Sequence, residues 1–325
     1  MMLLDRNRLA CLIPPPQHLG IIKALWEQRG EPMPIAVALG VEPALPYVGG
    51  MPLPEGADES HYLGAYFGEP LDVVPAETVD LLVPATAEIV IEGHVSHTDV
   101  ADEGPMGEYP GYLDRSSALP RPVLHVTAVT YRDQAILPVA VAGARRGGPH
   151  RLGNATRRRN DPRAASGEPA GRRVLGVLES ANHWWVVAVQ PDWHEQTGLS
   201  SKQLAEQVGQ TVFGAGKLAF GVPKLLLIEN DIDIADPKQV IWAFASRAHP
   251  EHGEIHFANE PQNILPIYLD AHERLSYHAT KIVHNCLIAD RFDKNERPTP
   301  SDLTHAWPAD IRQHVIDNWQ TYGYR

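Results

Sequence analysis

Several segments of the first 143 residues are rich in Val, Ile, Thr and Tyr, which is typical of strands, and they are 35–40, 79–83, 88–96, 123–131 and 136–142. Ile89, Ile91 and Val95 fall on one side of an alternating pattern. One helical pattern follows three prolines and stops at Gly30. Its apolar positions are Ile21, Ile22, Leu25 and Trp26. The pattern predicts a mainly β region that contains one short amphipathic helix.

The pattern changes in the second half of the chain. Residues 183–189 read as a strand, 200–212 as a helix with Leu204 and Val208 facing inward, and 224–229 as another strand. This β-α-β order predicts a second, α/β domain. A terminal helix is expected from Pro308, with one apolar stripe for docking. The stripe consists of Ile311, Val315, Trp319 and Tyr322.

An Arg- and Gly-rich segment, 144–173, separates the two patterns. It has too few large aliphatic residues to bury a strand or a helix face, so a basic loop is the simplest interpretation. Phosphate binding by Arg157, Arg158 and Arg159 is one alternative, and a locally shifted reading frame is another. The expected domains are 1–143, 174–300 and 301–325, with 144–173 as an atypical segment between the first two.

The composition of the chain argues against several classes of partner and binding site. A net charge of −12 argues against nucleic acid and anionic membranes as partners. Cys11 and Cys286 form neither a disulfide framework nor a zinc motif. The chain begins without a signal-peptide pattern and has no apolar run of about 18 residues. We therefore expect a cytoplasmic protein whose partner is a small molecule or another protein.

The segment Glu103-Gly104-Pro105-Met106-Gly107-Glu108 places two carboxylates around a turn rather than along a helix. If both point into one volume, the more buried acid keeps its proton while the other stays ionised, as general acid-base chemistry requires. A solvated acidic turn is the plain alternative. A glycosidase-like carboxylate pair is a third reading, which the separation of the two carboxyl groups would decide.

Three further polar residues lie near Gly and Pro residues in the sequence. They are His18, which directly follows Gln17, then Glu59 and Lys217. Taken singly, each is more typical of a helix cap or a solvated side chain. Together they are suited to a divalent cation and a phosphate, since hard cations prefer carboxylate oxygens and phosphates prefer Lys and free N–H groups.

These motifs resemble the signature of UbiD-type decarboxylases, and most of all the fungal ferulic acid (phenylacrylic acid) decarboxylases. The resemblance is carried by Val83–Gly93, Glu103–Tyr112, Asp5–Leu9, Pro15–His18, Met51–Pro54, Asp231–Asp233, Ile241–Phe244 and Asn318-Trp319. It implies an α/β (α+β) fold: a split β-barrel flavin-binding domain, then an α/β oligomerisation domain and a C-terminal helix.

The resemblance also implies roles for individual residues. Glu108 matches the acid that donates a proton to the carbon that has lost CO2, and Glu103 matches its network partner. His18 and Glu59 match ligands of a divalent metal. The cofactor-contacting positions are Gln17, His18, Met51, Pro52, Glu59 and Lys217, and the substrate-pocket positions are Tyr109, Asn263 and Leu265.

The implied activity is reversible, non-oxidative decarboxylation of an α,β-unsaturated or aromatic acid through a prenylated-FMN cycloadduct. The implied cofactors are prenylated FMN and Mn²⁺, with K⁺ as a further ion. The implied partners are a second copy of the chain and a flavin prenyltransferase that supplies the cofactor. The family places an Asn metal ligand and a catalytic Arg just before the segment that matches Met1. A non-catalytic homologue with a structural or regulatory role is the alternative function.

Overall fold

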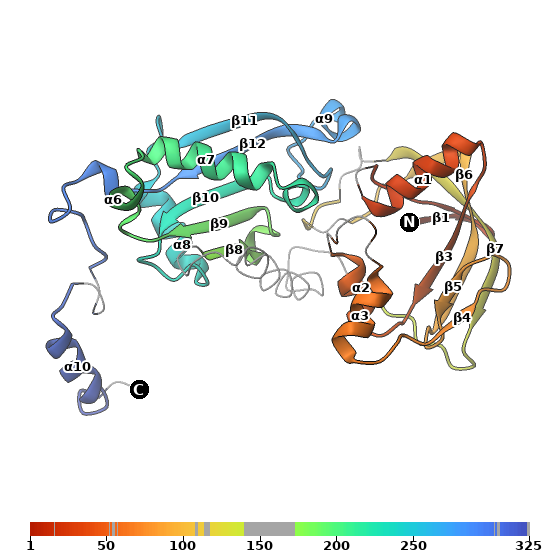
Figure 1. The fold of residues 1–325 in the computed structure, drawn as a ribbon, viewed down its shortest axis with the longest axis horizontal. Helices are drawn as coiled ribbons and strands as arrows, with labels where there is room; N and C mark the ends of the chain where they lie inside the picture. The colour runs from red at the N-terminus through yellow and green to blue at the C-terminus, as the bar shows by residue number, and fades with distance from the viewer. Residues whose placement is uncertain are drawn as a thin grey trace. The chain divides into compact units, whose positions relative to one another are not determined.

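The computed structural model describes residues 1–15, 17–51, 53, 56, 58–107, 110–113, 118–139, 173–301, 303 and 306–323, without the side chains of 217–219. It consists of two compact units (Figure 1). Unit 1 contains the described residues of Met1–Ala155, Gly216–Gly221 and Asn263–Tyr277, and unit 2 contains those of Thr156–Ala215, Val222–Gln262 and His278–Arg325. Two short segments from the second half of the chain thus belong to unit 1.

Unit 1 is built on an antiparallel five-stranded sheet of order β1-β2-β7-β6-β3. Its strands are β1 (Met2–Asp5), β2 (Arg8–Ala10), β3 (Met33–Leu39), β6 (Ile89–Glu103) and β7 (Leu119–Tyr131). The strands predicted at 35–40, 88–96 and 123–131 are therefore present. The described strands form an open sheet rather than a closed barrel. Residues 136–139 were expected in a strand and lie in none, whereas 140–172 fall outside the described residues.

The N-terminal part of unit 1 also contains α1 (His18–Arg29), α2 (Ala44–Gly49), α3 (Glu59–Phe67), and a hairpin of β4 (Val73–Pro75) paired with β5 (Leu82–Pro84). Helix α1 ends as predicted, because Gly30 takes the left-handed conformation (φ 71°) that favours glycine. Its apolar face differs from the expectation. Trp26 packs against the core of the sheet, whereas Ile21, Ile22 and Leu25 are exposed.

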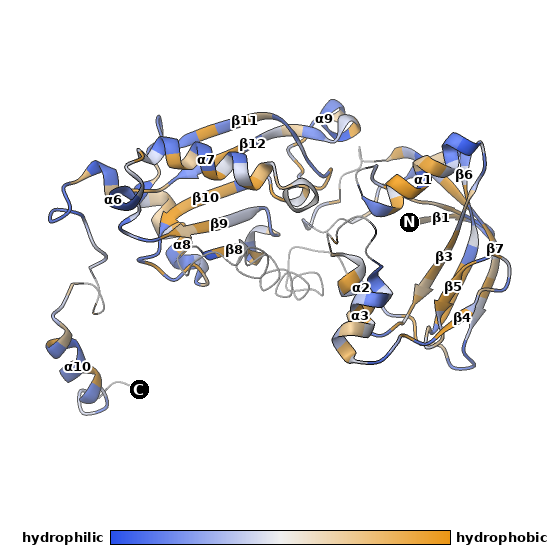
Figure 2. Ribbon diagram, viewed as in Figure 1, coloured by the Kyte–Doolittle hydropathy of each residue, from blue (hydrophilic) through white to orange (hydrophobic). Residues whose placement is uncertain are grey.

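Unit 2 contains a mixed sheet of order β11-β12-β10-β9-β8. Its strands are β8 (Arg173–Val177), β9 (Trp184–Val189), β10 (Lys224–Glu229), β11 (Glu254–Pro261) and β12 (His278–Asn285). The three central strands are parallel, and an antiparallel strand lies at each edge. Strands buried on both faces are expected to be almost wholly apolar, and β9 and β10 are largely orange in the hydropathy view (Figure 2). The mixed α+β class is thus confirmed.

Helices α7 (Ser201–Phe213) and α8 (Pro237–Arg247) pack on opposite faces of this sheet. Ser200 forms the capping box that starts α7, and Leu204 and Val208 are buried as predicted. The shorter helices of unit 2 are η1 (Leu178–Ser180), α6 (Trp193–Thr197), η3 (Ala289–Arg291) and α10 (Ala309–Asp317). Because α10 ends at Asp317, Trp319 and Tyr322 lie beyond the helix that was expected to carry them.

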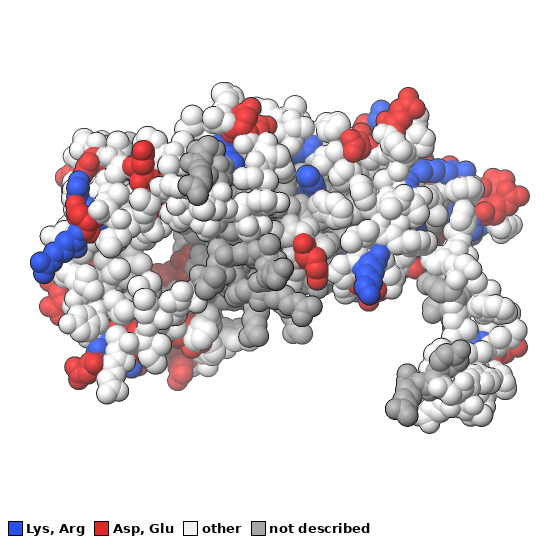
Figure 3. All heavy atoms as spheres, turned by 180° about the vertical axis from the view of Figure 1, so that it is seen from behind, with Lys and Arg blue, Asp and Glu red and all other residues white. Residues whose placement is uncertain are grey.

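On the face in Figure 3, acidic and basic side chains are interspersed rather than gathered by sign. Among the described helices, none has the length and apolarity needed to cross a membrane. Cys11 and Cys286 are both buried free thiols.

Lys281 on β12 is a buried cation within unit 2. Its side chain is fully buried, and its Nζ lies 5.2 Å from the centroid of the Phe213 ring. Burial lowers the pKa of Lys281 from 10.5 to about 8, and the nearby carboxylate of Glu260 opposes this shift. The folded state therefore releases this proton more readily than the unfolded chain does.

This difference in pKa predicts a pH-dependent stability. Between pH 8 and 10.5 the unfolded chain binds more protons at Lys281 than the folded chain, so the free energy of unfolding rises with pH in this window. The gain is at most about 3 kcal/mol. Lys281→Met is expected to lack it, and urea titrations of both proteins across the window measure the difference. Parallel pH profiles of the two proteins would show that Lys281 is not the source.

Candidate active site

The loop that follows β6 turns back on itself, as its glycines and proline predict. Gly104 has a φ of 106°, a backbone conformation that side chains other than glycine rarely adopt. Further along, Gly107 pairs with Leu113 in an isolated antiparallel bridge. The loop therefore begins directly at Glu103, the last residue of β6.

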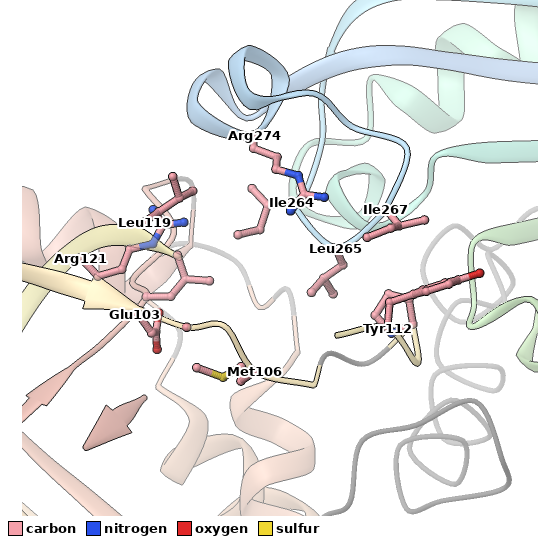
Figure 4. Close-up of a pocket in the computed structure, with 12 residues that line it drawn as sticks. Glu103, Met106, Tyr112, Leu119, Arg121, Ile264, Leu265, Ile267 and Arg274 are labelled. Atoms are coloured by element: carbon pink, nitrogen blue, oxygen red, sulfur yellow. The ribbon is translucent and has the colours of Figure 1, made fainter. Parts of the chain in front are cut away.

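Glu103 lies at the wall of a small cavity within unit 1. The residue is 9% exposed, and the cavity has a volume of about 40 Å³. Loop residues Gly104, Met106, Pro110 and Tyr112 contribute to its lining (Figure 4). The α-amino group of Met1 lies 2.9 Å from Oε1 of Glu103. Glu103 is thus a buried carboxylate at the cavity wall with one cationic contact.

His18 and Glu59 come together although 41 residues separate them in the sequence. His18 is the first residue of α1 and Glu59 the first of α3, and Nδ1 of His18 lies 3.4 Å from Oε1 of Glu59. Nε2 of His18 is buried without a hydrogen-bond partner among the described residues. An unpartnered buried imidazole nitrogen beside a carboxylate fits a divalent metal, which takes both types of ligand.

His18 and Glu59 alone do not complete a metal site. Within the described ranges, no group of three or more His, Cys, Asp or Glu residues is placed to hold a metal ion. His18 and Glu59 would thus supply two ligands, and further ligands would have to come from elsewhere. Glu59 also lines a wide groove of about 1490 Å³ within unit 1.

Four other predicted site residues are described. Gln17 is the exposed N-cap residue of α1, and Met51 packs against the cluster of Val48, Leu53 and Leu63. The side chain of Asn263 forms two hydrogen bonds to the backbone. Its Nδ2 donates to the carbonyl of Phe220 at 3.3 Å, and its Oδ1 accepts from the N–H of Leu265 at 3.0 Å. Leu265 lines the cavity beside Glu103.

The remaining predicted site residues lie outside the description. Glu108, Tyr109 and Pro52 are not among the described residues, and the side chain of Lys217 is not described. The separation of the two carboxyl groups, which would test the glycosidase-like reading, is therefore not measured. Glu103 and Leu265 share one cavity, and His18 and Glu59 form a separate close pair.

Sequence reasoning missed two cationic residues of the cavity, Arg121 and Arg274. Arg274 comes from a short helix, α9 (Ala271–Ser276), that was not predicted. Arg121 lies on β7, and the alternation of side chains along this strand was a sequence signal for its position. Once β6 and β7 pair, alternation along β7 places Arg121 and Leu119 on one face, but only the strand register shows that this face is the one that Glu103 shares.

Comparisons with known protein families and curated proteins give one consistent result. Residues 1–145 match the 3-octaprenyl-4-hydroxybenzoate carboxy-lyase Rift-related domain of UbiD, and residues 164–286 match the C-terminal domain of the same family. The chain is 41% identical over 330 residues to pyrrole-2-carboxylic acid decarboxylase of Pseudomonas aeruginosa. It is 32% identical over 331 residues to ferulic acid decarboxylase 1 of Saccharomyces cerevisiae. Both matches cover 100% of this chain and 65% of the relative.

Solved structures agree. The UbiD-class enzyme HmfF from Pelotomaculum thermopropionicum, in complex with FMN, matches with a TM-score of 0.69 and 28% identity, over 91% of this chain and 62% of that one. Vanillic acid decarboxylase of Sedimentibacter hydroxybenzoicus shares the fold, with a TM-score of 0.77 at 19% identity, over 99% of this chain and 64% of that one. The resemblance inferred from the motifs is confirmed, and the chain belongs to the UbiD family.

Proposed function

We propose that this chain takes part in the decarboxylation of an aromatic or α,β-unsaturated carboxylic acid with prenylated FMN as cofactor. The observation that carries the proposal is the buried carboxylate of Glu103 at the wall of a largely apolar cavity, in a chain of the UbiD family. The FMN and prFMN complexes of HmfF support the choice of cofactor. When bound, the flavin would supply the electron sink for the carbon that loses CO2.

The protein would supply orientation, exclusion of water and a proton. Apolar side chains around the cavity, such as Leu265, would hold the body of the substrate and keep water away from the reacting carbon. Glu103 would orient the reacting group and exchange a proton with its network. Glu108 is proposed as the acid whose carboxyl group delivers a proton to that carbon.

A divalent metal, Mn²⁺ in this proposal, would be held by His18 and Glu59, with K⁺ as a further ion. Gln17, Met51, Pro52 and Lys217 are proposed to contact the cofactor, and Tyr109 and Asn263 the substrate. In the resemblance, the Arg partner of Glu103 precedes the position that matches Met1. In this structure the α-amino nitrogen of Met1 lies 2.9 Å from Oε1 of Glu103.

We also propose that the chain forms a homo-oligomer and that a flavin prenyltransferase supplies its cofactor. The exposed apolar residues of the terminal region support an oligomer, and they are Ile311, Ile316, Trp319 and Tyr322.

His18→Gln tests the metal and cofactor sites directly. The variant is expected to lower Mn²⁺ affinity by more than about tenfold, because an amide replaces an imidazole whose nitrogens face a carboxylate and an unpartnered position. Titration calorimetry with Mn²⁺, and the visible absorbance of flavin retained after co-production with a prenyltransferase, measure the two effects.

His125→Gln is the matched control, because Nε2 of His125 also contacts a carboxylate, that of Asp99, at 3.0 Å. It is expected to keep both metal and flavin. Equal metal affinity and flavin content in the two variants would remove His18 from the proposed site.

A further inference from the structure

Residues 263–265 form a turn that is closed by a side chain. Oδ1 of Asn263 accepts a hydrogen bond from the N–H of Leu265 at 3.0 Å, the pattern by which an Asn side chain closes a turn over the residue two positions on. Pro266 comes next in the chain, and a residue before proline is biased toward extended backbone conformations. The backbone of Leu265 is therefore constrained on both sides, by an acceptor before it and a proline ring after it.

The same amide holds this turn to a second segment of unit 1. Nδ2 of Asn263 donates to the carbonyl oxygen of Phe220 at 3.3 Å, and the backbone N–H of Asn263 donates to the same oxygen at 3.0 Å. Phe220 belongs to the 3₁₀ helix η2 (Gly216–Gly221) and is 9% exposed. Its ring stacks on Tyr277, with 6.2 Å between the ring centroids. Phe220 thus anchors both ends of the segment 263–277.

The segment 263–277 supplies part of the apolar wall of the cavity beside Glu103. Its aliphatic lining residues are Ile264, Leu265 and Ile267 (Figure 4). The free volume of the cavity is small, about 40 Å³, so a shift of one wall side chain changes a large fraction of it. The turn at Asn263 therefore controls the space that an apolar group meets beside Glu103.

A hydrogen bond from the Asn263 amide to the substrate is the competing account of this residue. An amide that turned toward a ligand would give up its bonds to Leu265 and Phe220. Exchanging two bonds to the backbone for one bond to a ligand is unfavourable, and it would withdraw the acceptor from a partly buried N–H. The geometry therefore favours an indirect role for Asn263, through the side chain that its turn holds in place.

We infer that Asn263 is a positioning residue, which selects among acids by fixing Leu265 in the cavity wall rather than by donating a hydrogen bond to the substrate. The identity of the ligand as an unsaturated or aromatic acid rests on the proposed function, which this inference deepens. The turn itself does not, because it is built from the contacts of Asn263 with Leu265 and Phe220 alone.

Hydrogen–deuterium exchange, read by fragmentation mass spectrometry, tests the turn without any ligand. In Asn263→Leu, an apolar side chain of similar size replaces the amide. The N–H of Leu265 is then expected to exchange about tenfold faster, as for one lost hydrogen bond. In Asn263→Asp its exchange should stay near that of the unmodified chain, because a carboxylate oxygen still accepts from this N–H. Unchanged exchange in Asn263→Leu would overturn the inference.

Titration calorimetry with sorbate and cinnamate on the full chain tests the effect on selection. The two acids share an α,β-unsaturated carboxylate and differ in the apolar body. Asn263→Leu is expected to change the ratio of their dissociation constants by about tenfold, whereas Asn263→Asp should keep the ratio. If Asn263 bound the substrate directly, Asp would be the more damaging change, because its charge would repel an acid. That order of effects would contradict the inference.

A double-variant cycle with Leu265→Ala shows whether Leu265 carries the effect. Asn263→Leu should alter the ratio much less in the Leu265→Ala background than in the unmodified chain, and equal changes in both would refute the indirect role. Asp233→Leu is the matched control, because Oδ1 of Asp233 accepts from the N–H of Ala235 at 2.9 Å in an exposed turn of unit 2. It should keep the ratio. Circular dichroism confirms folding, and Asn263→Ala serves in place of any Asn263→Leu protein that does not fold.

Release of CO2 from the same two acids separates the inference from the proposed function. A chain whose ratio shifts as expected but that releases no CO2 from either acid would overturn the proposed function and leave the role of Asn263 standing. A chain that decarboxylates both acids, with a ratio that Asn263→Leu leaves unchanged, would do the reverse. Binding of neither acid by the unmodified chain would overturn both.

Discussion

Replacing Glu103 by Gln is expected to slow CO2 release about 100- to 10,000-fold, the range for loss of a general acid or base. Glu103 is buried at the cavity wall, and an amide there can neither ionise nor exchange a proton. In the proposed function the substrate is held mainly by the apolar wall of the cavity, so KM should change much less than kcat. Initial rates of CO2 release over a range of substrate concentrations separate the two parameters.

Asp102→Asn is the matched control for this experiment. Asp102 precedes Glu103 on β6, so its side chain points to the opposite face of the strand and is exposed. The substitution makes the same change in charge and should leave the rate nearly unchanged. Comparable losses in both variants would indicate that net charge, rather than Glu103 itself, controls the rate.

Arg247→Met is expected to lower the free energy of unfolding by about 3–5 kcal/mol, as for other buried ion pairs that lose one partner. Arg247 is 7% exposed, and its Nη1 and Nη2 donate to Asp231 at 2.9 and 2.8 Å. The same guanidinium lies 3.5 Å from the carboxylate of Glu229, which is 3% exposed. Without Arg247, the negative charge of Glu229 would remain buried in the interior of unit 2.

The neutral N–H donors around Glu229 do not remove this penalty. Its Oε1 accepts from the indole of Trp193 at 3.2 Å and from the backbone of Ile288 and Ala289 at 2.7 and 3.0 Å. Adding Glu229→Gln to Arg247→Met should therefore recover part of the lost stability. Urea unfolding measures all three proteins, with the exposed Lys202→Met as control. A loss in Arg247→Met no larger than in Lys202→Met would refute this account of the network.

The sequence predicts those helices and strands whose caps and apolar patterns agree with the way they pack in the fold. Helix α7 combines a Ser200 cap with apolar residues at helical spacing. Strand β9 and residues 225–228 of β10 are the apolar runs that a buried parallel sheet requires. The α1 helix shows the limit of this reasoning. Periodicity identified the helix and Gly30 identified its end, yet the exposure of Ile22 depends on what the fold places beside it.

Some residues of the candidate site could likewise be predicted from the sequence, and others could not. Chemistry and spacing identified Glu103, and they singled out His18 and Glu59, which the fold brings to 3.4 Å. The arginines of the cavity could not be found in this way. Arg274 reaches the site only because residues 263–277 join unit 1, and Arg121 depends on a strand register that is irregular between Val95 and Val100.

The central claim is that this chain supports decarboxylation with prenylated FMN. The most direct measurement is release of labelled CO2 from a carboxyl-labelled unsaturated acid, by full-length protein co-produced with a flavin prenyltransferase and assayed in D2O. The expected result is flavin absorbance in the purified protein, labelled CO2, and one deuterium at the carbon that carried the carboxylate, with the deuterated product lost in Glu108→Gln. Protein that retains the flavin and metal but releases no CO2 from muconate, sorbate or cinnamate would contradict the account and favour a non-catalytic homologue.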